Sequence, residues 1–265
     1  MRKAISKGYK HFDVHVLPVL KDNYTYAIQC HASKEVALVD VSEVKPVVSY
    51  MTEKLGNPKF SILTTHKHWD HSGGNKDMAK QFPGLAIFGG AHDDIPAVTQ
   101  PLNDGDVFGL GELKVAVLHT PCHTSGHVLY HVYHEDAKED GALFTGDTLF
   151  VGGIGAFFEG DAAQMVKATT RIANLPPNTD IYAGHEYTVN FLKFSRDVEP
   201  DNAFVSEKLA YFEKLRGDGL PTMPSTVADE KRINLFMRHS DPVLQKATGI
   251  SDAVQLMQHL YDRCP

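Results

Sequence analysis

The stretch Thr65-His66-Lys67-His68-Trp69-Asp70-His71 places three histidines and one aspartate within six residues. It follows the apolar run 60–63, so the cluster lies at the carboxyl end of an expected strand. Side chains two residues apart in extended backbone face the same way, so His66 and His68 can bind one metal ion. Asp70 and His71 come after the chain turns and can serve a second ion. Imidazole and carboxylate donors suit zinc, iron or manganese better than calcium.

Three further donors each follow an apolar run that we expect to be a strand. They are His123 after residues 113–119, Asp147 after residues 142–145 and His185 after residues 181–183. A lone histidine after a strand is more often a hydrogen-bonded surface residue, and an aspartate after glycine can simply cap a turn. One metal ion needs three or four ligands, however, and strand ends meet at one edge of a layered fold. Because the cluster at 66–71 is present, we interpret His123, Asp147 and His185 as further ligands of the same metal centre.

The pattern of apolar residues changes near residue 187. Before it, short apolar runs alternate with turn residues and helical patterns, which predicts an α/β layered sandwich. The expected strands are 12–19, 24–30, 36–41, 60–65, 85–88, 113–119, 128–133, 142–145 and 181–183, and the expected helices are 44–55, 75–81 and 161–175. After it the patterns are helical only, at 189–196, 202–216, 227–238, 242–248 and 251–262. We therefore expect a catalytic domain at residues 1–187 and a helical, substrate-binding domain at residues 188–265.

Composition excludes several classes of protein. The 26 Lys and Arg against 33 Asp and Glu give a net charge of −7, which disfavours binding to nucleic acid. No run approaches the ~18 apolar residues of a membrane span, so no membrane association is expected. Three cysteines without a CxxC pair favour a reducing compartment, the cytoplasm. Mitochondria are the alternative, because residues 1–12 are basic and free of acid. Nothing in the sequence suggests a subunit interface, so we expect a monomer.

The donor pattern resembles the metallo-β-lactamase superfamily, and three further motifs resemble glyoxalase II, the hydroxyacylglutathione hydrolases. These motifs are TPCHTSGH at 120–127, FTGDTLF at 144–150 and GHEYT at 184–188. The likeness continues through 193–200, 224–226 and 236–238, and so includes the helical part. It implies an αββα sandwich with a C-terminal α-helical domain. It also implies two divalent metal ions, zinc with iron or manganese as alternatives. One would be held by His66, His68 and His123, the other by Asp70, His71 and His185, with Asp147 bridging them.

The reaction implied by the resemblance is hydrolysis of S-D-lactoyl (2-hydroxyacyl) thioesters to D-lactate and free thiol, the second step of methylglyoxal detoxification. A hydroxide bound by both metal ions attacks the acyl carbonyl, so Asp70 and Asp147 are catalytic through the ions they hold. A thiol with a pKa of about 8.5 leaves readily as thiolate, so no general acid is needed. Asp40, at the end of the strand at 36–41, either steers a ligating imidazole or caps a turn. His127 is expected to be structural or to support a ligand.

The sequence departs from glyoxalase II where that family holds the carboxylates of glutathione with cationic side chains. The lysine that follows the Gly-Xaa-Gly at 153–155 is Ala156 here, and the arginine and lysine of the last helix correspond to Tyr261 and Cys264. A glutathione amidated at its glycine lacks the charge that those cations recognise. Trypanothione, two glutathiones joined by spermidine, is amidated in this way, so the chain resembles the trypanothione-dependent branch. Drift with retained use of glutathione is the alternative. The expected substrate-binding residues are Tyr187, Ile154, Phe158, Tyr261 and Cys264, with Phe157 beside them.

The sequence disfavours three other functions known on this fold. A persulfide dioxygenase with a single iron dispenses with part of the second metal set, whereas Asp70, His71 and His185 are all present. A nuclease needs a basic face, which the net charge of −7 disfavours. A non-catalytic binding module would be expected to have lost donors, and none of the seven is missing. The expected partner is therefore a small-molecule thioester.

Overall fold

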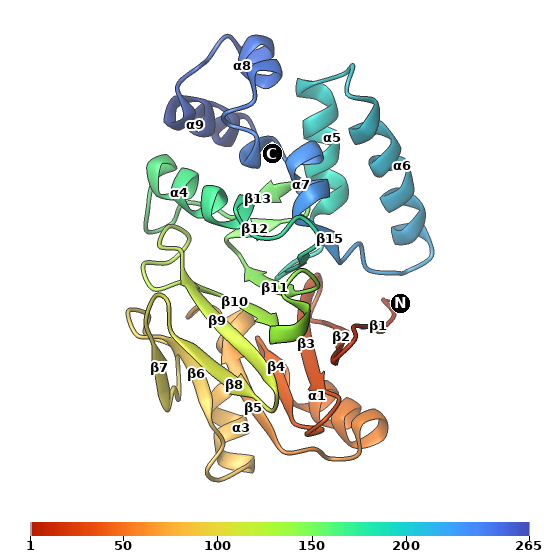
Figure 1. Ribbon diagram of the computed structural model, residues 1–265, viewed down its shortest axis with the longest axis vertical. Helices are drawn as coiled ribbons and strands as arrows, with labels where there is room; N and C mark the ends of the chain where they lie inside the picture. The colour runs from red at the N-terminus through yellow and green to blue at the C-terminus, as the bar shows by residue number, and fades with distance from the viewer. Residues whose placement is uncertain (1, 265) are drawn as a thin grey trace.

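Two β-sheets packed face to face form the centre of the structure, a computed structural model that describes residues 2–264 (Figure 1). The first sheet has the order β1-β2-β3-β4-β5-β6-β7, antiparallel as far as β4 and parallel from β4 onward. Its strands are β1 (Ile5–Gly8), β2 (Phe12–Val19), β3 (Asn23–Cys30), β4 (Val36–Val39), β5 (Phe60–Thr64), β6 (Ile87–Gly90) and β7 (Gln100–Leu102). The parallel part directs the carboxyl ends of β4 and β5 to one edge.

The second sheet has the order β15-β14-β11-β10-β9-β8, with β11 and β14 as its parallel pair. Its strands are β8 (Val107–Leu110), β9 (Leu113–His119), β10 (Val128–Tyr133), β11 (Ala142–Gly146), β14 (Asp180–Ala183) and β15 (Ser225–Thr226). A separate hairpin joins β12 (Leu149–Phe150) to β13 (Gly153–Ile154). Because β11 and β14 run in parallel, the loops that follow them also leave the sheet at one edge.

Alternation along the strands divides the core into layers. Val39 and Leu63 point between the sheets, whereas Leu38 and Ile62 point outward, as period-two strands require. The outward side chains pack on helices α1 (Val44–Tyr50) and α3 (Asn75–Gln81). Helix α1 continues as a π-helical turn, Met51–Leu55, which ends at Gly56 in a left-handed conformation with φ of 73°. Helices α1 and α3, on the outer face of the first sheet, therefore form the first helical layer.

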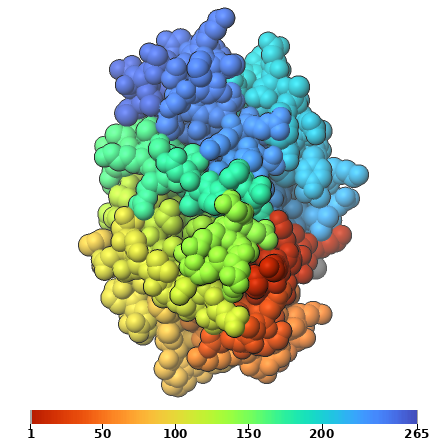
Figure 2. Space-filling view, viewed as in Figure 1, coloured from red at the N-terminus to blue at the C-terminus, as the bar shows by residue number. Residues whose placement is uncertain are grey.

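The outer face of the second sheet is covered by α4 (Ala162–Ala173) and by the C-terminal helices. Leu129, Leu143 and Ile181 pack there against α4 and α9 (Ala253–Arg263). The other elements are α5 (Thr188–Val198), α6 (Ala203–Gly217), α7 (Val227–Ile233), the 3₁₀ turn Leu235–Met237 and α8 (Pro242–Thr248). They form the cyan and blue upper part of the molecule (Figure 2). Leu192 of α5 and Leu209 of α6 belong to the same buried apolar cluster as the inner faces of the sheets. The layers run α, β, β, α, which confirms the predicted fold class.

Each of the nine predicted strands is present, with ends shifted by no more than two residues. The expectation that only helices follow residue 187 was wrong at one place, because Ser225–Thr226 pairs with β14 as a two-residue edge strand. The helix predicted at 227–238 is interrupted at Asn234, whose extended backbone ends α7 and whose side chain accepts the N–H of Phe236. None of the described helices is long and apolar enough to cross a membrane.

Candidate metal centre

The seven predicted donors come together at one edge of the two sheets. His66 and His68 follow β5, and Asp70 and His71 lie on the short helix α2 (Trp69–Ser72) that comes next. The other three follow the strands of the second sheet: His123 after β9, Asp147 after β11 and His185 after β14. Three groups of these side chains have donor atoms within 4.8 Å of one another: His66, His68 and His123; His66, His71 and Asp147; Asp70, His71 and His185.

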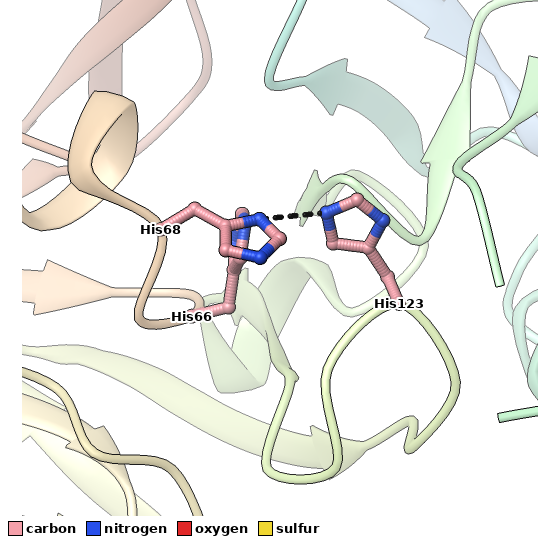
Figure 3. Close-up of side chains that lie close together, drawn as sticks. All are labelled: His66, His68 and His123. Atoms are coloured by element: carbon pink, nitrogen blue, oxygen red, sulfur yellow. Dashed lines mark hydrogen bonds between the residues drawn. The ribbon is translucent and has the colours of Figure 1, made fainter. Parts of the chain in front are cut away.

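The first set consists of three imidazoles from two loops (Figure 3). His68 Nδ1 lies 3.0 Å from His66 Nε2 and 3.1 Å from His123 Nε2. Burial lowers the pKa values of His66 and His123 below the ordinary value, so both imidazoles are neutral. Neutral imidazole is the form that ligates a metal ion. The set can therefore accept an ion without first releasing protons from these two rings.

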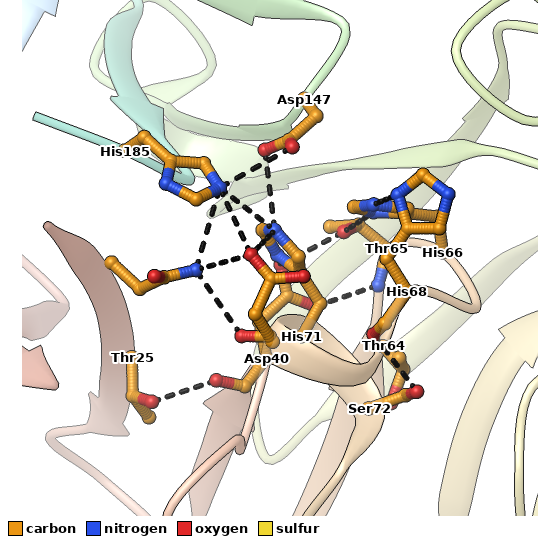
Figure 4. A network of polar contacts seen from close by, with 12 residues as sticks. Thr25, Asp40, Thr64, Thr65, His66, His68, His71, Ser72, Asp147 and His185 are labelled. Carbon is orange, nitrogen blue, oxygen red and sulfur yellow. Dashed lines mark hydrogen bonds and ion pairs between the residues drawn. The ribbon is translucent and has the colours of Figure 1, made fainter. Parts of the chain in front are cut away.

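The second set joins Asp70, His71 and His185 to Asp147. The side chains of His71, His185 and Asp147 point toward one another (Figure 4). His185 Nε2 lies 3.3 Å from Asp70 Oδ2 and 3.2 Å from His71 Nε2. Asp147 touches both sets, because its Oδ2 is 3.3 Å from His185 Nε2 and 3.4 Å from His123 Nε2. Its Oδ1 is 3.3 Å from His71 Nε2. A carboxylate in this position can contact two ions at once.

The charge balance of the centre fits divalent cations. Although burial acts in the opposite direction, His71 and His185 hold the pKa of Asp147 well below its usual range, so the carboxylate is ionised. Although burial opposes it, the charge of Asp147 and the hydrogen bonds that His185 donates to Asp147 and Asp70 raise the pKa of His185 to about 10. Asp147 Oδ1 is buried and accepts no hydrogen bond from the described residues. A buried, ionised oxygen needs a positively charged partner. His71 Nε2 lies 3.3 Å away and supplies that charge when the imidazole is protonated, and a divalent ion would supply it when the neutral imidazole acts as a ligand.

Two carboxylates orient the imidazoles of the second set. Asp40 Oδ2 lies 2.9 Å from His71 Nδ1, and Asp22 Oδ1 lies 2.9 Å from His185 Nδ1. The contact with His71 agrees with the first expectation for Asp40, and its other oxygen accepts the backbone N–H of Thr65 at 2.8 Å, after β5 and not in its own turn. Such contacts fix the ring and the tautomer that leaves Nε2 free for a metal ion. Asp22 was not predicted, because an acidic residue in the turn between β2 and β3 is typical of turns in general.

Two other side chains support the donors. Asn23 Nδ2 donates to Asp70 Oδ2 at 2.8 Å, and sequence reasoning missed this contact as well. His127 Nε2 accepts the backbone N–H of Asp147 at 3.1 Å, which agrees with the supporting role expected for it. At Gly184 a Cβ atom would lie 2.5 Å from Asp147 Oδ1 and 2.7 Å from His71 Cε1. Only glycine allows the chain before His185 to pass this close to the donors.

A cavity of about 620 Å³ lies between the hairpin β12–β13 and the C-terminal helices. Four of the five expected substrate-binding residues line it: Ile154, Tyr187, Tyr261 and Cys264. The other lining residues are Phe150, Ala156, Asn190, Phe191, Phe236 and Asp262. Among these described residues Asp262 carries the only charge, and none is lysine or arginine. The cations Lys193 and Arg263 line a separate groove that shares Asn190 with this cavity.

The aromatic residues at the cavity differ from expectation in their placement. Phe158 does not line the cavity; its ring is 68% exposed and lies beside His68 and His123. Phe157 stacks on Tyr261 with ring centroids 3.9 Å apart, and its backbone N–H donates to the Tyr261 hydroxyl at 3.1 Å. Cys264 lies one residue beyond α9 rather than within it, because the helix ends at Arg263. Tyr261 is thus held in place by the loop that follows β13.

The fold and the convergent donors resemble those of the metallo-β-lactamase superfamily, whose family model matches residues 81–185. A metallo-β-lactamase structure from Staphylococcus aureus superposes with a TM-score of 0.67 at 22% identity, covering 97% of this chain and 68% of that one. ETHE1 from Myxococcus xanthus superposes with a TM-score of 0.60 at 21% identity, covering 93% of this chain and 96% of that one. At these identities the likeness concerns the fold.

Within that superfamily the sequence comparisons single out one family. A model of the hydroxyacylglutathione hydrolase C-terminus matches residues 186–263. The cytoplasmic hydroxyacylglutathione hydrolase of Arabidopsis thaliana is 40% identical over 93% of this chain and 96% of that protein. The hydroxyacylglutathione hydrolase of Trichodesmium erythraeum is also 40% identical, over 95% of this chain and 98% of that protein. The chain belongs to the hydroxyacylglutathione hydrolase (glyoxalase II) family, which consists of thioester hydrolases.

Proposed function

We propose that this chain hydrolyses S-D-lactoyl and related 2-hydroxyacyl thioesters, and that it prefers trypanothione over glutathione as the thiol. Family membership supports the hydrolysis of a small-molecule thioester. The observation that carries the thiol preference is the cavity, whose one charged lining residue among those described is Asp262. An acidic cavity attracts a cationic ligand and repels a carboxylate.

The centre is proposed to hold two divalent ions, of zinc or alternatively of iron or manganese. His66, His68 and His123 would bind one ion and Asp70, His71 and His185 the other. Asp147 would bind both, since its two oxygens lie 3.3–3.4 Å from nitrogens of each set. When bound, such ions lower the pKa of a coordinated water toward ~7 and polarise the thioester carbonyl. Asp70 and Asp147 thus act in catalysis through the charge that they place at the centre.

The side chains around the centre hold the donors and the substrate. Asp40 and Asp22 keep the Nε2 atoms of His71 and His185 directed into the centre. Tyr187 stacks on His185 with ring centroids 4.9 Å apart and also lines the cavity, so it stands between the donors and the thiol. Burial raises the pKa of Tyr187 to about 12, which keeps its hydroxyl protonated and able to donate a hydrogen bond. The leaving thiolate needs no proton from a side chain.

The cavity wall explains the proposed choice of thiol. A free glycine carboxylate would enter a space without a lysine or arginine on the described walls and would face Asp262. The amidated glycine of trypanothione has no such charge, and the ammonium group of its spermidine linker is attracted by Asp262. Burial also raises the pKa of the Cys264 thiol to about 11, so this side chain is neutral at pH 7. Glutathione esters are therefore expected to bind more weakly.

The C-terminal helices are proposed to form the substrate-binding domain, with its boundary at residues 187 and 188. The cavity takes Phe150 and Ile154 from the hairpin β12–β13, and Asn190 and Phe191 from α5. Tyr261 on α9 closes the opposite side. The thiol would thus be held between the two parts of the chain, next to the donors that lie at the sheet edge.

The experiment that tests this function compares two esters on metal-loaded protein. Hydrolysis of S-D-lactoyltrypanothione and S-D-lactoylglutathione is followed by release of free thiol, and kcat/KM is determined for each. A higher value for the trypanothione ester supports both the activity and the preference. An equal or higher value for the glutathione ester would retain the hydrolase and overturn the preference. Turnover of neither ester by protein that holds its metal ions would contradict the proposed activity.

A further inference from the structure

A buried carboxylate outside the ligand set, Asp93, joins the two loops that carry the first set of donors. Asp93 follows β6, and its side chain has no exposed surface. Its Oδ2 accepts the backbone N–H of Lys67 at 2.8 Å and the hydroxyl of Thr124 at 2.9 Å. Lys67 is the residue between His66 and His68, and Thr124 is the residue after His123. Each partner of Asp93 is therefore the chain neighbour of a proposed ligand.

The close approach at Gly126 shows how firmly the second loop is seated. A Cβ atom at Gly126 would lie 2.3 Å from the backbone N of Asp93 and 2.3 Å from the carbonyl carbon of His92. Backbone atoms cannot move aside as the end of a flexible side chain can. The loop that carries His123 thus rests directly on the segment that carries Asp93.

Lys67 and Glu159 form a second connection between the two ligand loops. Lys67 Nζ lies 3.4 Å from Asp93 Oδ1 and 2.7 Å from Glu159 Oε1. Glu159 Oε2 in turn accepts the backbone N–H of Ser125 at 2.7 Å. The contacts form a closed ring through both ligand loops, in which the ammonium group of Lys67 compensates the buried charge of Asp93. A buried carboxylate requires such a partner.

The two sets of donors are supported in different ways. In the second set, carboxylates bind the imidazoles directly: Asp40 at His71 and Asp22 at His185. In the first set, the Nδ1 atoms of His66 and His123 face neutral oxygens, the Thr65 hydroxyl and the Ala156 carbonyl. Those contacts orient each ring but do not fix the distance between the two loops. Asp93 is the described side chain that hydrogen-bonds to both loops through one oxygen.

We propose that Asp93 is the positioning residue for the first metal site, setting the separation of the His66–His68 loop from the His123 loop. This inference rests on the proposed two-ion centre, and it assigns Asp93 to one of the two sites. Removal of Asp93 should weaken the ion held by His66, His68 and His123. The ion held by Asp70, His71 and His185 should be unaffected, because its supports do not involve Asp93.

The test is a zinc titration of metal-free protein against a chromophoric chelator, in backgrounds that leave one site at a time. In the His185→Ala background, adding Asp93→Ala should weaken the remaining zinc by about 10- to 100-fold, as losses of supporting contacts typically do. In the His123→Ala background, the same addition should leave the affinity unchanged. Asp94→Ala is the matched control, since it removes a neighbouring carboxylate for which no hydrogen bond or ion pair is found among the described residues.

The variant Asp93→Asn distinguishes the hydrogen bonds of Asp93 to the two loops from the effect of its negative charge. The Asn oxygen can accept both hydrogen bonds of Oδ2, while its amide loses the contact with Lys67 Nζ, so we expect a smaller loss than with alanine. Equal weakening in both backgrounds, or none in the His185→Ala background, would overturn the role of Asp93. A wild type that binds a single ion would instead contradict the proposed two-ion centre. The two double variants still decide the role of Asp93 in that case, because each is compared with its own parent.

Discussion

Placing two cations in the cavity should shift the chain toward glutathione esters. The double substitution Tyr261→Arg with Cys264→Lys adds the charges that the described cavity wall lacks. A hydrogen bond to a charged group contributes about 1.5–3 kcal/mol when protected from water. The cavity is partly open, so we take about 1 kcal/mol for each cation, or about 2 kcal/mol together. At 1.4 kcal/mol per tenfold change, kcat/KM for S-D-lactoylglutathione should rise roughly 30-fold.

The contacts of Tyr261 suggest that its substitution by arginine lowers the stability of the protein only modestly. Its hydroxyl accepts the N–H of Phe157, and losing that hydrogen bond should lower the free energy of unfolding by about 1 kcal/mol. The guanidinium plane of arginine can replace the tyrosine ring in the stack on Phe157. The trypanothione ester should lose activity in the same variant, because the new cations repel its ammonium group.

The assay determines kcat/KM for both esters at low and at high ionic strength. The gain should shrink in high salt, where the Debye length falls to about 3 Å at 1 M. The neutral double variant Tyr261→Gln with Cys264→Gln controls for altered shape. No gain in a folded, metal-loaded cationic variant would refute the reasoning, and so would an equal gain in the neutral one.

Three other predictions concern the centre and the core. Asp147→Ala should lose most bound metal and most activity because its carboxylate touches both sets of donors; unchanged metal content after gel filtration would contradict its bridging role. Gly184→Ala should lower the metal content without changing the far-UV circular dichroism, since its Cβ would lie 2.5 Å from Asp147 Oδ1. Burial raises the pKa of Glu230 to about 7 from an ordinary 4.5. The folded state therefore binds a proton that the unfolded chain releases, and stability falls as pH rises from about 4.5 through 7. Glu230→Gln removes the destabilisation caused by ionising the buried carboxyl, so the Tm of the variant should exceed that of the wild type at pH 8 and match it at pH 5. An equal difference in Tm at both pH values would contradict the raised pKa of Glu230.

The strands of the core were predictable because burial imposes a pattern on them. Strands β2 and β9 alternate buried with more exposed residues, and β10 is buried on both faces, so their apolar patterns carry a strong signal. Two of the missed strands, β1 and β7 at the edges of the first sheet, carry little of this signal. In β1 (Ile5–Gly8) no residue is fully buried, and in β7 (Gln100–Leu102) Leu102 alone is. Edge strands of this kind form because a neighbour offers a free edge, which is a property of the fold and not of their own residues.

In the metal centre, too, some residues are marked by a local sequence pattern, whereas others are defined only by contacts between distant parts of the chain. Its donors were predictable because histidines and aspartates at strand ends stand out in a sequence, and the first four are adjacent. Only some of their supports were predictable: Asp40 and His127 were expected. Asp22 and Asp93 were not, since they are acidic residues in loops, a common surface pattern. What distinguishes Asp93 is that its carboxylate is buried between Lys67 and Thr124, which lie 57 residues apart in the chain. A residue that acts by holding two distant loops together has no local pattern, so its role becomes visible only in three dimensions.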